Sequence, residues 1–259
     1  MTNLRTNDST HFAPQPTHKI LVRISGEIKN YVKRRDEASF VFTENDKNTM
    51  GVIAIVATLG GLGGQATAIA SNASALDEAA DYVEFEIGEN AIKGWLWRSP
   101  FSEGDIVDVA AEWQGEYYEV FGIARPSDRV IALYPHCSRS RISHIKNALK
   151  WWAIISVGVH TAVFIINYLT IGNIDKVINF WDEFFTEYLG GLWILGLVLT
   201  LAVPVASLAM KWMPFVTVAE KVFKTLGLPN SGDIDLVRSS KEQVTKQDPP
   251  ELGIMYFKY

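Results

Sequence analysis

The chain has 259 residues, of which 48% are apolar and 20% charged, and its formal net charge is −5. This composition excludes a disordered or fibrous chain, and the acidic balance argues against non-specific binding of nucleic acid, which needs a basic surface. The single cysteine, Cys137, excludes a disulfide framework and a thiolate metal cluster. The polar first residues lack the apolar core of a cleavable signal peptide, so none is expected.

The N-terminal half predicts a disordered tail followed by a β domain. Residues 1–18 are polar and contain two prolines. Residues 19–137 hold short alternating runs, separated by turn signals such as Ser99-Pro100. Strands are expected at 20–24, 39–43, 82–87, 92–97, 105–111, 116–124 and 129–134. Short strands at this spacing predict a small antiparallel domain, either an OB-like barrel or a sandwich.

An uncharged segment rich in Gly and Ala, residues 51–76, interrupts the strands. Its run Gly61-Leu62-Gly63-Gly64 fits part of a dinucleotide fingerprint, but that motif needs a βαβ unit, which the flanking pattern lacks. Two other interpretations are a soluble helical insertion packed on the β domain and a hairpin that enters a membrane.

Two apolar stretches, residues 151–170 and 190–210, contain no formal charge. Each matches the roughly 20 helical residues that cross a bilayer, and aromatic residues stand at their edges, as they do at membrane interfaces. The chain is therefore expected to be an α+β membrane protein, with the β domain preceding a two-helix transmembrane hairpin over residues 149–214.

The flanking charges predict the orientation of this hairpin. Residues 138–150 contain four bases and no acid, and Lys211, Lys221 and Lys224 follow the second span. Because bases stay on the cytoplasmic side, both termini are expected in the cytoplasm and the connector outside. The expected location is a membrane that the chain crosses twice.

The connector, residues 174–189, is amphipathic and predicts a helix in the outer interface. Its acids Asp182, Glu183 and Glu187 lie away from the apolar stripe and form a candidate outer acidic ring. Residues 215–259 are expected to be a cytoplasmic tail, with a short helix ended by Gly227. Residues 252–259 are expected to add an edge strand or to pack on the β domain.

The sequence contains no nucleophile elbow, no HExxH, no phosphate-binding loop and no zinc spacing. No catalytic, cofactor-binding or metal-binding residue is therefore predicted, and the protein is not expected to be an enzyme. His136 and Cys137 are adjacent, but the position predicts a turn before a membrane helix rather than a catalytic pair.

Polar residues inside the spans are the candidate functional groups. Ser156, His160 and Asn167 share one helical face, and Thr200 and Ser207 share a face of the second span. In one interpretation, His160 and Asn167 bond to Thr200 and Ser207 in a packed hairpin. In the other, several hairpins assemble as a homo-oligomer around an aqueous path, and the acidic connector favours cations.

Four segments carry a resemblance to a known family: GWLWRSPFSEGDIVDVAAEW, RPSDRVIALYPHCSRS, LGLPNSGDIDLVRSS and the terminal MYFKY. In this order around two spans, the chain resembles a family of small bacterial membrane proteins described as type VI secretion system effectors. The resemblance implies a toxin delivered between bacteria or a protein accompanying one. The implied partners are the lipid bilayer, the secretion apparatus and a cognate immunity protein. Two alternatives stay open, a resident immunity protein and a membrane-tethered protein-binding module.

Overall fold

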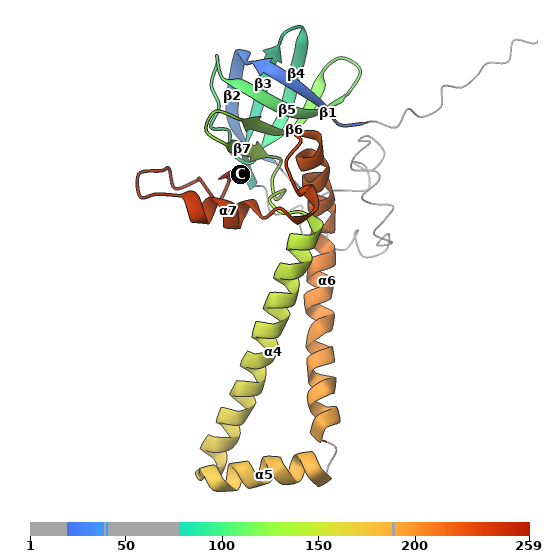
Figure 1. Ribbon diagram of the computed structural model, residues 1–259, viewed down its shortest axis with the longest axis vertical. Helices are drawn as coiled ribbons and strands as arrows, with labels where there is room; N and C mark the ends of the chain where they lie inside the picture. Colours follow the sequence, from blue (N-terminus) through green and yellow to red (C-terminus); the bar gives the residue numbers. More distant parts are fainter. Residues whose placement is uncertain (1–19, 39, 41–77, 188–189) are drawn as a thin grey trace, which may run out of the picture.

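A computed structural model describes residues 20–38, 40, 78–187 and 190–259. The described chain forms a sheet domain at one end and two long helices that leave it together, with a third helix across their far ends (Figure 1). The expected α+β class is confirmed. The predicted tail 1–18 and the insertion 51–76 lie outside the described residues, as does the expected strand 39–43 except for Phe40.

The other expected strands are confirmed within a few residues. The sequence missed one strand, β2, because its charged run KNYVKRRDEA lacks the apolar alternation of a half-buried strand. The terminal segment adds a short strand, β8, as expected. The strands are β1 (Val22–Glu27), β2 (Lys29–Ala38), β3 (Glu78–Ile87), β4 (Asn90–Leu96), β5 (Ile106–Trp113), β6 (Tyr118–Arg125), β7 (Val130–Leu133) and β8 (Tyr256–Lys258).

The strands form a mixed open sheet in the order β1-β5-β6-β4-β3-β2, and β7 extends it from β6 to β8. The expectation of a purely antiparallel domain is wrong at one place, since β4 and β6 are parallel through Ile92↔Tyr118 and Lys93↔Glu119. The reason is topological. The chain reverses twice between β4 and β6 while β5 takes the other edge of β6, so β4 and β6 become neighbours running the same way.

The two ends of this strand order are consecutive in the chain. Only Ile28 separates β1, which borders β5, from β2, which borders β3. Ile28 is fully buried. Its N–H donates to the Asp105 carbonyl at 2.9 Å, and its carbonyl accepts from Gly104 N–H at 2.9 Å. One bent segment therefore brings the two edges of the sheet together around a common apolar interior.

Both faces of the sheet are covered by apolar contacts. One cluster fills the interior of the curved sheet, including Ile28, Phe85, Ile92, Leu96, Phe101, Val109 and Ile123. A second cluster lies between the outer face and the C-terminal part of the chain, including Phe121, Ile131, Leu133, Val218, Val222, Phe223, Leu236 and Phe257. The residues after the second span are thus part of the sheet domain's packing rather than a separate tail.

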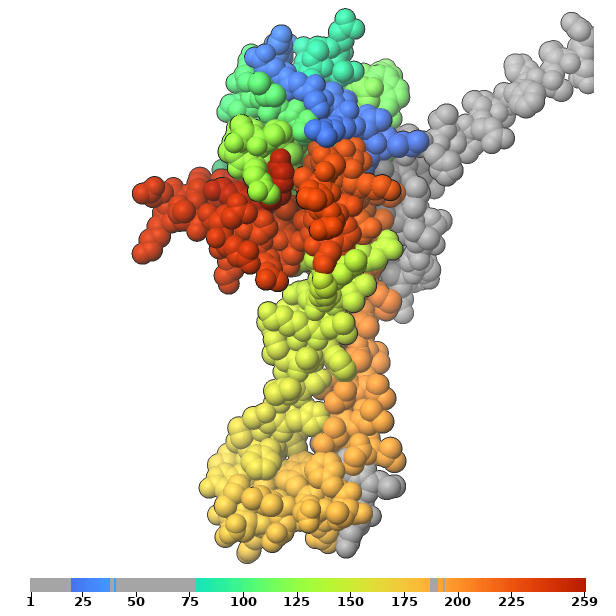
Figure 2. Space-filling model, in the orientation of Figure 1, coloured from blue at the N-terminus to red at the C-terminus, as the bar shows by residue number. Residues whose placement is uncertain are grey.

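The long helices are α4 (Arg141–Ile171) and α6 (Gly190–Thr225), and α5 (Ile174–Glu187) lies between them. Both long helices are apolar enough to cross a membrane, and only 6% and 0% of their most apolar windows are buried. They form a narrow stalk below the broad sheet domain, with α5 at its foot (Figure 2). The C-terminal part adds the short helix η1 (Ser231–Asp233) and α7 (Leu236–Gln243).

The second apolar stretch continues without a break into the sheet domain. The sequence predicted a span ending near Met210 and a separate short helix, whereas α6 runs on through Pro214 to Thr225. Gly227, at φ 77°, follows its end as expected, and Leu228 N–H donates to the Phe223 carbonyl at 2.9 Å. A single helix therefore joins the apolar stalk to the sheet.

Candidate functional site

The polar residues predicted to face one another in the spans bond to the backbone of their own helices. His160 Nδ1 lies 2.6 Å from the Ser156 carbonyl, and Asn167 Nδ2 donates to the Val163 carbonyl at 3.1 Å. Ser156 is buried, and its hydroxyl has no hydrogen-bond partner within the described residues. His160 and Asn167 are half-buried. The hydrogen bonds described for His160 and Asn167 thus run along α4 to its own carbonyls.

The matching residues of α6 lie on an exposed surface. Thr200 and Ser207 are both exposed, and Thr200 Oγ1 donates to the Gly196 carbonyl at 2.7 Å. A Cβ atom at Gly196 would meet nothing within 4 Å. The structure therefore brings Ser156, His160 and Asn167 together on α4, and Thr200 and Ser207 on α6, as two separate polar surfaces.

Two residues that the sequence did not select make the cross-helix hydrogen bonds. Trp152 Nε1 donates to the Val198 carbonyl at 3.1 Å, and His144 Nε2 lies 3.0 Å from the Ala209 carbonyl. An indole N–H in an apolar surrounding needs an acceptor, which is the signal that Trp152 offered. The sequence does not show which backbone carbonyl of the other helix lies beside the indole. The acceptor, Val198, could therefore not be predicted.

Helix α5 closes the far end of the stalk. Asn173 caps its start, since Asn173 Oδ1 accepts from the N–H groups of Asp175 and Lys176 at 2.9 and 3.2 Å. Val177 is fully buried. Trp181 and Phe184 are half-buried. The predicted apolar stripe is confirmed for these three positions.

The outward side of α5 mixes acidic and apolar residues. Asp182 and Glu183 are exposed, and so are Ile178 and Phe185. The side chain of Glu187 lies outside the described part of the structure. The two described members of the predicted acidic ring therefore lie at the end of the stalk opposite the sheet domain (Figure 1).

The contact between α6 and the sheet is close enough to depend on a glycine. Val218, Val222 and Phe223 are fully buried against the outer face of the sheet. A Cβ atom at Gly122 of β6 would lie 2.6 Å from Val222 Cγ1 and 2.8 Å from Leu133 Cδ2. Such a distance leaves no room for a side chain at residue 122. The Val222 side chain of α6 therefore packs directly on the backbone of β6.

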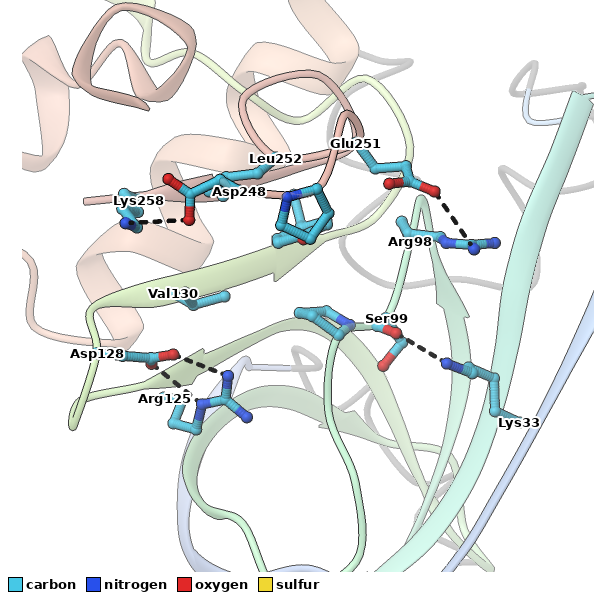
Figure 3. Close-up of a pocket in the computed structure, with 13 residues that line it drawn as sticks. Lys33, Arg98, Ser99, Arg125, Asp128, Val130, Asp248, Glu251, Leu252 and Lys258 are labelled. Atoms are coloured by element: carbon cyan, nitrogen blue, oxygen red, sulfur yellow. Dashed lines mark hydrogen bonds and ion pairs between the residues drawn. The ribbon is translucent and has the colours of Figure 1, made fainter. Parts of the chain in front are cut away.

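A charged cleft of about 520 Å³ lies between the sheet and the C-terminal segment (Figure 3). Arg98, Arg125 and Lys258 form ion pairs, and Lys33 donates to the Ser99 carbonyl at 3.0 Å. Arg125 lies 2.6 Å from Asp105 and 2.8 Å from Asp128, Arg98 lies 3.5 Å from Glu251, and Lys258 lies 3.8 Å from Asp248. Burial alone would raise the pKa of Asp128, but its hydrogen bond and charge pairing with Arg125 lower it. Among these pairs, Arg98–Glu251 ties the C-terminal segment to the sheet domain.

The adjacent His136 and Cys137 point into different surroundings. Cys137 is buried in the cluster between sheet and α6, and burial raises the pKa of its thiol. The His136 ring lies 5.0 Å from Trp97 and 5.2 Å from both Trp212 and Phe215, and its Nε2 lies 3.0 Å from a Glu78 oxygen. Within residues 20–38, 40, 78–187 and 190–259, no cluster of His, Cys, Asp or Glu could hold a metal ion.

Comparison of the chain with protein-family models, with curated proteins and with solved structures finds no match. The geometry described above is therefore the basis for the proposals that follow.

Proposed function

We propose that the protein works in the bacterial inner membrane, with α4 and α6 as its two spans. The observation that carries this proposal is the exposure of the stalk, since 6% and 0% of its apolar windows are buried. The core helix of a soluble protein would be mostly buried, and neither helix is near the N-terminus as a signal sequence would be. Exposed apolar surface of this extent costs free energy in water and is stable in lipid.

The charges support an orientation with the sheet domain in the cytoplasm. The basic segment 138–150 lies at the sheet-domain end of the stalk, and Asp182 and Glu183 lie at the other end. Because Cys137 is the only cysteine and is buried, single added cysteines report on topology. A membrane-impermeant maleimide added outside intact spheroplasts should label Asn173→Cys and leave Gln243→Cys unlabelled. The opposite pattern would contradict the orientation.

The function we propose is that of a type VI secretion system effector that depolarises the inner membrane as an oligomeric pore. The described residues of one chain supply two candidate spans, so an aqueous path needs several copies. Thr200 and Ser207 support this proposal, because they place polar side chains on the outer surface of α6 and away from the interior of the single hairpin. A second copy could cover that surface in the membrane.

Inducible expression with a membrane-potential dye tests this function. The wild-type chain should depolarise the host, and Thr200→Val with Ser207→Ala should slow depolarisation because two hydroxyls leave the proposed path. Thr170→Val is the matched control, since Thr170 is also exposed and bonds to its own helix, with Oγ1 2.8 Å from the Ile166 carbonyl. A chain that inserts but never alters the potential, from either side of the membrane, would refute the pore.

The same assay tests the α4 face and the acidic ring. If His160 and Asn167 border the path, His160→Leu with Asn167→Leu should abolish depolarisation while the protein still accumulates. Replacing Asp182, Glu183 and Glu187 by their amides should lower the cation-to-anion permeability ratio, and more so at low salt, because charges are screened over about 10 Å at 0.1 M. An unchanged ratio would show that α5 does not border the path.

The second candidate function is a membrane-tethered protein-binding module, and the charged cleft of Figure 3 favours it. The mixed open sheet, with its bent segment β1–β2 and its parallel β4–β6 pair, supports the OB-like barrel that we propose for this domain, a fold that binds ligands on its face. A resident immunity protein is a form of this function. Protection of cells from a co-expressed membrane toxin, without depolarisation by the chain itself, would favour it over the effector.

A further inference from the structure

A second cavity, also of about 520 Å³, lies where the sheet domain meets the two long helices. Trp97 and His136 come from the sheet domain, and Ser138 and Arg139 come from the segment just before α4. The other walls come from the first part of α4 and the middle of α6. This position straddles the predicted end of the spans near Trp151 and Met210. The cavity is therefore at the level where a bilayer's head groups would meet its acyl chains.

The lining of this cavity changes from polar to apolar along the stalk. His136, Ser138 and Arg139 line the end beside the sheet domain, whereas Ile155, Val205 and Leu208 line the end within the apolar stretch. Trp151 and Trp212 also line it and are 53% and 40% exposed. Indole rings prefer the boundary between water and lipid. The walls thus match a ligand with a polar head and an apolar tail.

The polar end has a basic character. Arg139 is the permanently charged residue among the described lining residues, and no carboxylate lines the cavity. Its Nε donates to Asp235 Oδ2 at 3.0 Å, which holds the guanidinium in place. The cleft of Figure 3 differs, since bases and carboxylates alternate there. A phosphate group in the cavity at the stalk would share the Arg139 guanidinium with Asp235, and the nearby carboxylates of Asp235 and Glu78 contact lining residues from outside the lining.

The walls are held apart at a fixed spacing. The hydrogen bonds of His144 to Ala209 and of Trp152 to Val198 join α4 and α6 on either side of Ala148. The rings of His136, Trp212 and Phe215 pack on one another at centroid distances of 5.2 to 5.6 Å. A preformed cavity loses less entropy when it binds a ligand than one that must be assembled.

We propose that this cavity binds one anionic phospholipid of the cytoplasmic leaflet. Its phosphate lies beside Arg139, and the start of an acyl chain lies along Ile155, Val205 and Leu208. A cavity of this volume falls within the range of small-molecule sites, roughly 300–1,000 Å³. This inference rests on the proposed membrane location and not on the proposed pore.

Native mass spectrometry of the full chain, purified in detergent and stripped of lipid, tests the site. With added phosphatidylglycerol the chain should retain one lipid, and phosphatidylcholine should bind at least about tenfold more weakly, a difference of about 1.4 kcal/mol. Equal retention of both lipids would overturn the anionic assignment. Equal competition by glycerol phosphate, which has no acyl chain, would overturn the assignment to a lipid.

Two pairs of variants locate the binding. Asn147→Asp keeps the shape of a lining residue but adds a carboxylate, and it should weaken phosphatidylglycerol about tenfold, whereas Asn173→Asp at the start of α5 should change nothing. Ala148→Phe fills the cavity and should abolish retention, whereas Leu149→Phe, at an exposed position outside the lining, should not. Full retention by Ala148→Phe would overturn the site.

The outcomes separate this inference from the proposed function. A chain that retains phosphatidylglycerol but never depolarises cells refutes only the pore. A chain that depolarises cells but retains no lipid refutes only the lipid site. Extraction of the chain from membranes by alkaline carbonate would refute the membrane location and the lipid site together.

Discussion

The two halves of α6 belong to one continuous helix and have opposite surroundings. From Leu192 to Met210 large apolar side chains are exposed, with Leu199 57% and Val203 68% accessible. From Val218 to Phe223 the apolar side chains are fully buried. The difference lies in where the charges fall, since the first half carries no formal charge and the second has charged residues such as Glu220 and Lys224 outside its buried apolar stripe.

This contrast shows where each half obtains its stability. The second half is stable because the sheet removes its apolar stripe from water, and the first half requires an apolar solvent to do the same. One continuous helix, with Pro204 and Pro214 inside it, contains both halves. The four predictions below test the contrast, from the largest expected effect to the smallest.

Phe223→Ala should cause the largest loss of stability. Phe223 is fully buried between α6 and the sheet, and removing a buried Phe side chain costs about 3–5 kcal/mol. Leu199→Ala in the exposed half is the control, and it should cost less than about 0.5 kcal/mol. Thermal unfolding of the detergent-solubilised chain measures both, and equal losses would show that the two halves do not differ in packing.

Gly122→Val should separate docking from insertion. The new side chain would collide with Val222 and Leu133, and overpacking of this kind costs about 1–3 kcal/mol. Gly196→Val, on the open surface of α6, should leave the stability unchanged. Both variants should insert into membranes equally well. Loss of insertion by Gly122→Val alone would mean that the sheet domain is needed to form the spans.

Trp152→Phe should lower the stability of the packing between α4 and α6 by a smaller amount. It removes the indole donor that bonds to the Val198 carbonyl, and interhelical hydrogen bonds in membranes average about 0.6 kcal/mol. Trp151→Phe, at the neighbouring exposed position, is the matched control. Unfolding of the chain in mixed micelles with increasing sodium dodecyl sulfate measures the difference, and no difference would place the stabilisation of the hairpin elsewhere.

The smallest effect concerns pH and His136. Burial lowers the pKa of His136, although the charge and the hydrogen bond of Glu78 oppose this. The unfolded chain therefore binds a proton near pH 6.5, where the folded chain does not yet bind one. Stability should be lost as the pH falls below about 6.5, until it reaches the lowered folded pKa.

His136→Asn is the variant that tests this pH dependence. His136 has φ 67°, a backbone region in which Asn is well tolerated. Thermal unfolding between pH 7.5 and 5 should have a shallower slope for the variant than for the wild-type chain. An equal slope would assign the dependence to other groups.

Much of the candidate site was visible in the sequence as residue types but not as contacts. Ser156, His160 and Asn167 were expected on one face and lie on one face, because helical spacing fixes which residues share a side. Their hydrogen bonds were not predictable, because each side chain had both its own helix and the facing helix within reach. Trp152 and His144 made the cross-helix bonds because the crossing of α4 and α6 placed carbonyls beside them.

The amino-acid sequence by itself determined the α+β class, the strands with clear alternation, the two apolar helices and the end of α6 at Gly227, because these depend on local periodicity and backbone preference. Only the tertiary structure decided the parallel neighbours β4 and β6, the charged strand β2, the continuous path of α6 into the sheet and the cavity at the top of the stalk. These features depend on which distant segments meet. Gly122 is an example, since nothing near it in sequence shows that Val222 needs the space that its missing side chain leaves.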